Sequence, residues 1–145
     1  MYKHILVPVD LNEEGFADKA VQQAVWLAKQ SHAELHLLTV MPAVHMPMVA
    51  SYFPKEAEEK MARDLNDHLC SFAAQNIDDD VVYHTYVRRG KVHTTIVEYA
   101  YKLGADLIVM PSHKRNAINR VVLGSVASQV VDHSPVHVMV VKPQG

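Results

Sequence analysis

Five short apolar runs alternate with four segments of helical periodicity, and this alternation limits the possible fold more than any other feature of the chain. Each apolar run has the length of a buried strand. Each helical segment repeats apolar residues every three or four positions. The pattern predicts an α/β fold with one open, parallel, five-stranded sheet and helices on both faces. The expected strands are residues 4–10, 34–40, 81–87, 106–110 and 136–141.

The four helical segments are separated from the strands by turn-forming residues. Gly104 follows the third segment, where a left-handed cap is expected. We expect residues 43–54, which lack a clean period, to form a loop, and residues 111–120 to form a polar connector. The expected helices lie in residues 16–28, 55–73, 92–103 and 123–131.

The position of each strand in the sheet follows from its apolar content. The most apolar strands, Ile5–Val9 and Leu107–Met110, are expected at the centre, and the more alternating Val81–Val87 nearer an edge. The fold expected is Rossmann-like with strand order 3-2-1-4-5. In such sheets ligands bind beyond the carboxyl ends of the strands, where the winding reverses. If the first and fourth strands are neighbours, Asp10 and the segment after Met110 line that crevice.

Length and charge exclude several classes of protein. A chain of 145 residues is expected to form one domain, residues 1–145. Its 14 Lys and Arg against 16 Asp and Glu give a net charge of −2, which argues against nucleic-acid binding through bulk positive charge. The single cysteine, Cys70, excludes an internal disulfide framework. No signal peptide or membrane-spanning run is apparent, so we expect a soluble, cytoplasmic protein.

Three nucleotide and hydrolase motifs are missing from the sequence. No glycine-rich loop ends in Gly-Lys-Ser or Gly-Lys-Thr, no Gly-x-Gly-x-x-Gly follows the first strand, and no Gly-x-Ser-x-Gly elbow occurs. A P-loop NTPase, a Rossmann dehydrogenase and an α/β hydrolase are therefore disfavoured.

The strongest candidate site is Gly124-Ser125, where the fourth helix begins. A glycine lets a ligand approach the backbone closely, and the free N–H groups of a first helical turn suit a phosphate. Lys114, Arg115 and Arg120 add positive charge nearby. The alternative is an ordinary helix start with solvated basic residues, and the spacing leaves both interpretations open.

The whole chain resembles the universal stress proteins of the UspA type. The resemblance rests on the sequences ILVPVD near the start, LLTVMP after the second strand, the turn at Gly90, and DLIVMPSHKRNAINRVVLGSVASQVVDHSPVHVMVV at the end. It implies a five-stranded parallel α/β domain in a homodimer. Some members of the family bind ATP or related adenine nucleotides, and others do not.

Nucleotide-binding members carry a loop of Gly, two residues, Gly, nine residues, Gly and Ser or Thr. Here Pro111 and Lys114 occupy the first two glycine positions, whereas Gly124-Ser125 matches the end of the loop. The loss of these two glycines stiffens the loop. It also places a side chain where the backbone of nucleotide-binding members approaches the phosphates. A subgroup with a Ser-His-basic loop resembles Ser112-His113-Lys114, and nucleotide binding is expected in that subgroup too.

The resemblance implies an adenine nucleotide, ATP or AMP with or without Mg²⁺, and little or no turnover. Asp10 would bind the ribose, the backbone of Val40 the adenine edge, and Gly124 to Val126 the phosphates. Spacing alone favours a turn role for Asp10 and core packing for Val40 and Met110. The residues that the resemblance implies at the site are Pro8, Val9, Asp10, Val40, Met110, Pro111, Ser112, His113, Lys114, Arg115, Gly124, Ser125 and Val126.

The last strand, Val136–Val141, is a candidate sheet edge, and such an edge can pair with another chain. The resemblance implies antiparallel pairing of this strand with its twofold mate in a homodimer. The alternatives are that Lys142 and Pro143 end the edge and keep the chain monomeric, and that the protein is a nucleotide-free interaction module.

Overall fold

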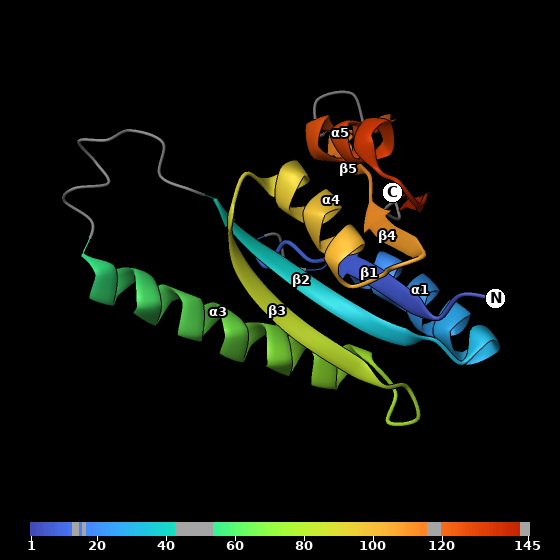
Figure 1. Ribbon diagram of the computed structural model, residues 1–145, viewed down its shortest axis with the longest axis horizontal. Helices are drawn as coiled ribbons and strands as arrows, with labels where there is room; N and C mark the ends of the chain where they lie inside the picture. Colours follow the sequence, from blue (N-terminus) through green and yellow to red (C-terminus); the bar gives the residue numbers. More distant parts are fainter. Residues whose placement is uncertain (13–14, 16, 43–53, 116–119, 143–145) are drawn as a thin grey trace.

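The computed structural model describes residues 1–12, 15, 17–42, 54–115 and 120–142, which form a sheet flanked by helices (Figure 1). The strands of the main sheet are β1 (His4–Pro8), β2 (Glu34–Pro42), β3 (Tyr83–Gly90), β4 (Leu107–Pro111) and β7 (His137–Val141). The helices are α1 (Asp18–Ser31), α3 (Lys55–Asn76), α4 (Val92–Lys102) and α5 (Ser125–His133). A separate hairpin consists of β5 (His113–Arg115) and β6 (Arg120–Val122).

The main sheet has the order β3-β2-β1-β4-β7, and all four pairings are parallel. The predicted α/β class and the strand order 3-2-1-4-5 are confirmed, with β7 as the fifth strand. The register places Ile5 of β1 between Leu35 of β2 and Leu107 of β4. The two most apolar strands are neighbours in the sheet, and β3 is its outermost strand beyond β2, as predicted.

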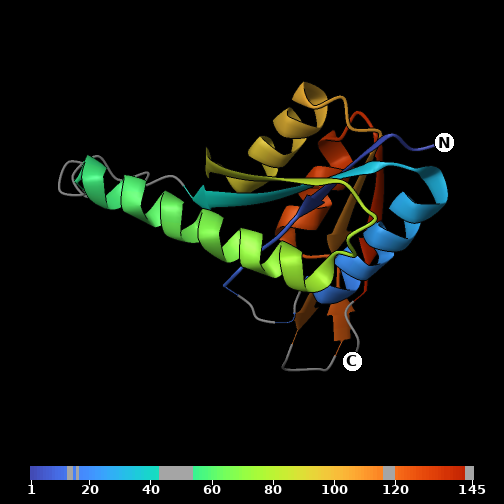
Figure 2. The same cartoon turned by 90° about the horizontal axis from the view of Figure 1, so that it is seen from below.

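Both faces of the sheet are covered, because successive strand residues point to opposite faces and the central strands are apolar at every position. On one face Ile5 and Val7 pack with residues of α1 and α3. On the other face Leu6 and Ile108 pack with residues of α4 and α5. Figure 2 shows α3 and α4 on opposite sides of β2 and β3.

The helix predictions are confirmed to within a few residues at each end. Gly104 has a φ of 65° just after α4, so the left-handed position predicted there is present. The prediction for β3 is wrong at its ends, because the strand runs to Gly90 instead of stopping at Val87. β2 also runs further than predicted, to Pro42 instead of Val40, and Pro42 lies opposite Gly90.

The polar connector predicted over residues 111–120 contains a strand that the sequence did not predict. His113–Arg115 pairs antiparallel with Arg120–Val122, and Arg115 lies opposite Arg120. Strands of three residues, one of them entirely basic, have too few alternating apolar residues to be recognised from the sequence.

No helix among the residues that the structure describes is both long and apolar enough to cross a membrane.

Gly90 has no room for a side chain. A Cβ atom there would lie 2.5 Å from the hydroxyl oxygen of Thr95 in α4. We predict that Gly90→Ala lowers the free energy of unfolding by roughly 1–3 kcal/mol through overpacking. The double variant, Gly90→Ala with Thr95→Ala, should lose less free energy of unfolding than the two single variants lose together, because the clashing oxygen is then absent. Urea denaturation of the three variants measures this coupling.

Gly104→Ala is the control, since Gly104 also has a positive φ but a Cβ there would have no atom within 4 Å. If the double variant loses as much free energy of unfolding as the two single variants together, the predicted clash is contradicted.

Candidate functional site

A cavity of about 520 Å³ lies at the carboxyl ends of β1, β2 and β4. Its size is within the range of small-molecule sites. Helices from both faces of the sheet form its walls, because the strands end between α3 on one side and α4 and α5 on the other. Among the described residues it is lined by Pro8, Val9, Asp10, Leu11, Asn12, Leu38, Thr39, Val40, Met41, Met61, Leu65, Val92, Ile96, Met110, Pro111, Leu123, Gly124, Ser125, Val126 and Ala127.

The cavity brings together most of the residues that the sequence singled out. Segments distant in the chain meet there: the end of β1, the end of β4 and the start of α5. The predicted site residues that line it are Pro8, Val9, Asp10, Val40, Met110, Pro111, Gly124, Ser125 and Val126.

Asp10 follows β1 at the rim of the cavity and is exposed. Its Oδ1 atom accepts a hydrogen bond from the backbone N–H of Asn12 at 3.0 Å. This Asx-type contact is the turn role that spacing alone favoured. It uses one carboxylate oxygen, so the turn role and a ligand contact through the other oxygen are compatible.

The end of β1 is fixed to β2 by two hydrogen bonds. The N–H of Val9 donates to the carbonyl of Leu38 at 2.8 Å, and the buried hydroxyl of Thr39 donates to the carbonyl of Val9 at 3.0 Å. Asp10 therefore extends from a rigid strand end.

The start of α5 opens into the cavity. Gly124 occupies the N-cap position with φ 80° and ψ 157°, a conformation that a glycine adopts far more easily than other residues. Its carbonyl accepts the first helical hydrogen bond, from Ser128 at 3.0 Å. The N–H groups of Ser125 and Val126 belong to the first turn and have no acceptor within the helix. Together with the helix dipole they make this end favourable for an anion.

The remaining predicted residues lie after Pro111. Ser112 is 3% exposed, and its hydroxyl has no hydrogen-bond partner among the described residues. It is not among the described residues that line the cavity. For His113, Lys114 and Arg115 the structure describes the backbone of β5 and not the side chains, so their relation to the cavity stays a prediction.

The sequence interpretation missed the walls contributed by α3 and α4. Met61 and Leu65 of α3, and Val92 and Ile96 of α4, line the cavity. Helical periodicity placed these residues on the apolar faces of their helices, and apolar faces are normally assigned to the core. The signal that could have found them is position, because each pair lies in the N-terminal half of its helix, the half nearer the carboxyl ends of the strands.

The comparisons with known proteins agree with this architecture. The family model described as the universal stress protein family matches residues 1–142. The chain belongs to the universal stress protein family.

Individual relatives cover the full length of this universal stress protein. Universal stress protein G of Shigella flexneri is 33% identical over 144 residues, which is 98% of this chain and 100% of the relative. The structure of universal stress protein UspA from Lactobacillus plantarum is 33% identical, with a TM-score of 0.74 and 97% of both chains covered. The hypothetical protein MJ0577 is 26% identical, with a TM-score of 0.83 over 100% of this chain and 99% of its own.

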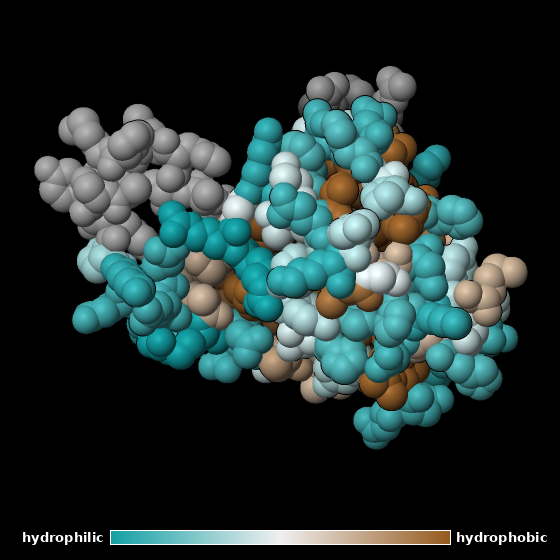
Figure 3. Space-filling model, viewed as in Figure 1, coloured by the Kyte–Doolittle hydropathy of each residue, from teal (hydrophilic) through white to brown (hydrophobic). Residues whose placement is uncertain are grey.

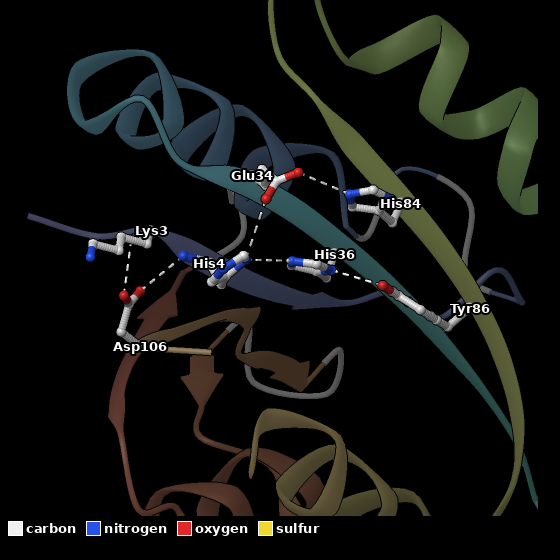
Figure 4. Close-up of polar contacts among 7 residues, drawn as sticks. All are labelled: Lys3, His4, Glu34, His36, His84, Tyr86 and Asp106. Atoms are coloured by element: carbon white, nitrogen blue, oxygen red, sulfur yellow. Dashed lines mark hydrogen bonds and ion pairs between the residues drawn. The ribbon is translucent and has the colours of Figure 1, made fainter. Parts of the chain in front are cut away.

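A network of histidines lies on the face of the sheet that packs against α4, and none of its residues is among those that line the cavity (Figure 4). We call it the histidine network and define it as His4, Glu34, His36, His84 and Tyr86, from β1, β2 and β3. The buried His36 is at its centre: its Nε2 lies 3.0 Å from Nδ1 of His4, and its Nδ1 lies 2.9 Å from the hydroxyl of Tyr86. The rings of His36 and His84 are stacked with centroids 5.0 Å apart.

The carboxylate of Glu34 lies between the two outer imidazoles of the histidine network. It is 3.1 Å from Nε2 of His84 and 3.7 Å from Nδ1 of His4. The hydrogen bond from His84 lowers the pKa of Glu34. Burial raises the pKa of Tyr86. Among the residues that the structure describes, no three His, Cys, Asp or Glu side chains converge to hold a metal ion.

The pKa of His36 is lowered from 6.5 to about 4, first because burial disfavours the imidazolium and then because His84 and His4 are close. Glu34 opposes this shift. The fold therefore favours neutral His36, and the unfolded chain binds more protons between pH 6.5 and 4. This contribution to stability is present above pH 6.5 and is lost as the pH falls through about 4.

We predict that the free energy of unfolding falls by about 2 kcal/mol more in the wild type than in His36→Gln when the pH is lowered from 7 to 5. Glutamine does not titrate, so the difference isolates His36 from the other acid-sensitive groups. Urea denaturation at the two pH values measures it. The same pH dependence in both proteins would contradict the lowered pKa.

Proposed function

We propose that this universal stress protein binds an adenine nucleotide in the cavity at the carboxyl ends of β1 and β4. One observation carries the proposal: a single cavity of about 520 Å³ is lined by both the carboxylate of Asp10 and the first turn of α5. The first group suits sugar hydroxyls and the second suits phosphates, so the pair matches a nucleoside phosphate. The candidate ligands are ATP, ADP and AMP.

The proposed arrangement follows the roles that the family resemblance implies for the residues at the cavity. The ribose contacts Asp10, beside Pro8 and Val9, and the adenine edge meets the backbone of Val40 with Met110 against the ligand. The phosphates bind at Gly124, Ser125 and Val126. Lys114 and Arg115 supply positive charge from β5, and Pro111, Ser112 and His113 complete the loop.

Two more distant solved structures support the proposal at the level of the fold. A universal stress protein in complex with cAMP is 23% identical to this chain, and one from Archaeoglobus fulgidus in complex with dAMP is 19% identical. Their TM-scores are 0.61 and 0.68. At these identities they indicate that a sheet of this topology can hold an adenine mononucleotide, and they assign no role to any residue of this chain.

The site is proposed to act as a switch rather than as an enzyme. Asp10 is the only carboxylate, and no histidine occurs, among the described residues that line the cavity. Fast phosphoryl transfer relies on metal-binding and nucleophile-positioning groups around the phosphates. Binding then acts by favouring one conformation of the loop after β4 or of the dimer. Hydrolysis, with or without Mg²⁺, is expected to be slow.

The rival function is a nucleotide-free interaction module. It is favoured by Pro111 and Lys114, which stand where nucleotide-binding relatives are expected to have glycines, and by the hairpin that starts at His113. On this hypothesis the loop closes the phosphate end, and the dimer surface carries the function.

We predict that the wild type binds AMP or ATP in calorimetric titration and that Gly124→Ala weakens binding at least about tenfold, since a Cβ displaces the backbone from the phosphates. Asp10→Ala should weaken binding as well. Gly104→Ala is the matched control, because it places an alanine at a similar positive φ on a residue that does not line the cavity. No heat with millimolar nucleotide would overturn the proposal and favour the rival.

We further propose that the protein is a cytoplasmic homodimer in which the two chains pair through β7. In the part of the chain that the structure describes, β7 has β4 on one side and no strand on the other. The carbonyl of Val141 points toward β4, because it accepts a hydrogen bond from the N–H of Ser112, just after β4, at 3.0 Å. Because alternate residues of a strand direct their backbone groups to opposite sides, the N–H of Val140 points to the open side.

We predict that Val140→Pro converts the dimer to a monomer without unfolding it, because proline is tolerated where the strand N–H faces outward. Met139→Pro is the contrasting variant. It removes an N–H directed at β4 and should destabilise the fold. Light scattering after size exclusion, with circular dichroism, measures both effects. A monomeric wild type, or a dimer that survives Val140→Pro, would contradict this interface.

A further inference from the structure

The N-terminal part of α3, residues 55–68, is unusual for a helix packed against a sheet. Residues 55–68 include none of the buried residues of α3, which are Leu69 and Ala73. Figures 1 and 2 show the start of α3 projecting beyond the ends of β2 and β3. A surface helix normally buries an apolar stripe along the part that contacts the protein. The apolar stripe of residues 55–68 must therefore have another role.

Met61 and Leu65 continue the apolar stripe of α3 toward its start, one turn apart, and both line the cavity. Leu69, the next residue of the stripe, is fully buried in the core, whereas Met61 is 43% exposed. The stripe thus passes from the core into the cavity wall. Figure 3 shows apolar side chains at the surface between the start of α3 and the strand ends.

An ion pair connects the projecting part of α3 to this edge of the sheet. Glu58, in the first turn of α3, pairs with Arg89 near the end of β3. Both side chains are partly exposed, so the pair contributes little to stability. Met61 and Leu65 lie one and two turns further along the same helix and line the cavity.

The cavity is chemically uneven. Asp10, Ser125 and the first turn of α5 make one part polar, whereas Met61 and Leu65, with Met41 of β2, make the α3 side apolar. A sugar phosphate would satisfy only the polar part. A flat aromatic group joined to it would also cover the apolar side chains, and a thioether makes favourable contacts with aromatic rings.

We propose that Met61 and Leu65 form the wall against which the purine base of the ligand packs, so that α3 determines the preference for a nucleotide over a simple sugar phosphate. This inference rests on the proposed nucleotide site and names the residues that contact its base. Binding of the ligand buries the exposed apolar stripe of α3 and reduces local unfolding of residues 55–68.

The test is calorimetric titration with two probes, AMP and ribose 5-phosphate, which differ only in the base. Met61→Ser combined with Leu65→Ser should bind AMP at least about tenfold more weakly, because the apolar contact with the base is lost. Its affinity for ribose 5-phosphate should be unchanged. Lys60→Ser combined with Asp64→Ser is the matched control. It has the same spacing on the same helix, and both residues are exposed and outside the cavity lining.

Hydrogen exchange of residues 55–68 gives a second readout without mutation. AMP should protect these amides, and ribose 5-phosphate should not. If the wild type binds AMP but the Met61 and Leu65 variant binds it equally well, or if AMP leaves exchange unchanged, the inference is overturned and the nucleotide site stands. Equal losses of AMP and ribose 5-phosphate affinity would indicate a merely structural role and also overturn it. A wild type that binds no AMP overturns the nucleotide site and this inference together.

Discussion

The parallel pairing of β1 with both β2 and β4 is the constraint on which the rest of the structure depends. The chain builds outward from β1 through β2 to β3, and then returns to the other side of β1 with β4. The helices of the two halves consequently lie on opposite faces, and the strands at the reversal separate at their carboxyl ends. Ile5, Leu6 and Val7 of β1 are completely buried as a result.

The two ends of the sheet differ in how they are held. At the amino end, Asp106 accepts hydrogen bonds from the N–H groups of Lys3 at 2.9 Å and His4 at 3.3 Å, and the histidine network connects three strands. At the carboxyl end the strands meet a cavity instead of a packed layer. The polar contacts of the amino end hold the strands in register, which leaves the other end available for a ligand.

Most of the fold could be predicted from the sequence because it depends on local periodicity and apolar content. The strand order also depends on which strands must be buried, and the apolar character of Ile5–Val9 and Leu107–Met110 indicated that. The hairpin at His113–Arg115 could not be predicted, because its pairing depends on tertiary context and not on an apolar pattern.

The candidate site was predictable where it consists of strand ends and the start of a helix, since parallel topology brings Asp10 and Gly124 to the same edge. The contribution of α3 was not predictable. Nothing in the spacing of Met61 and Leu65 separates a cavity wall from a core stripe, and only the projection of the helix beyond the strands distinguishes them.

The central claim is that one adenine nucleotide spans the crevice between Asp10 and the start of α5. Titration of ¹⁵N-labelled protein with AMP tests it most directly. The account predicts that the amide signals of Asp10, Gly124 and Ser125 shift together along one saturating curve, while those at the amino ends of the strands do not move. Saturable shifts confined to another surface, or no shifts at millimolar AMP, would contradict it.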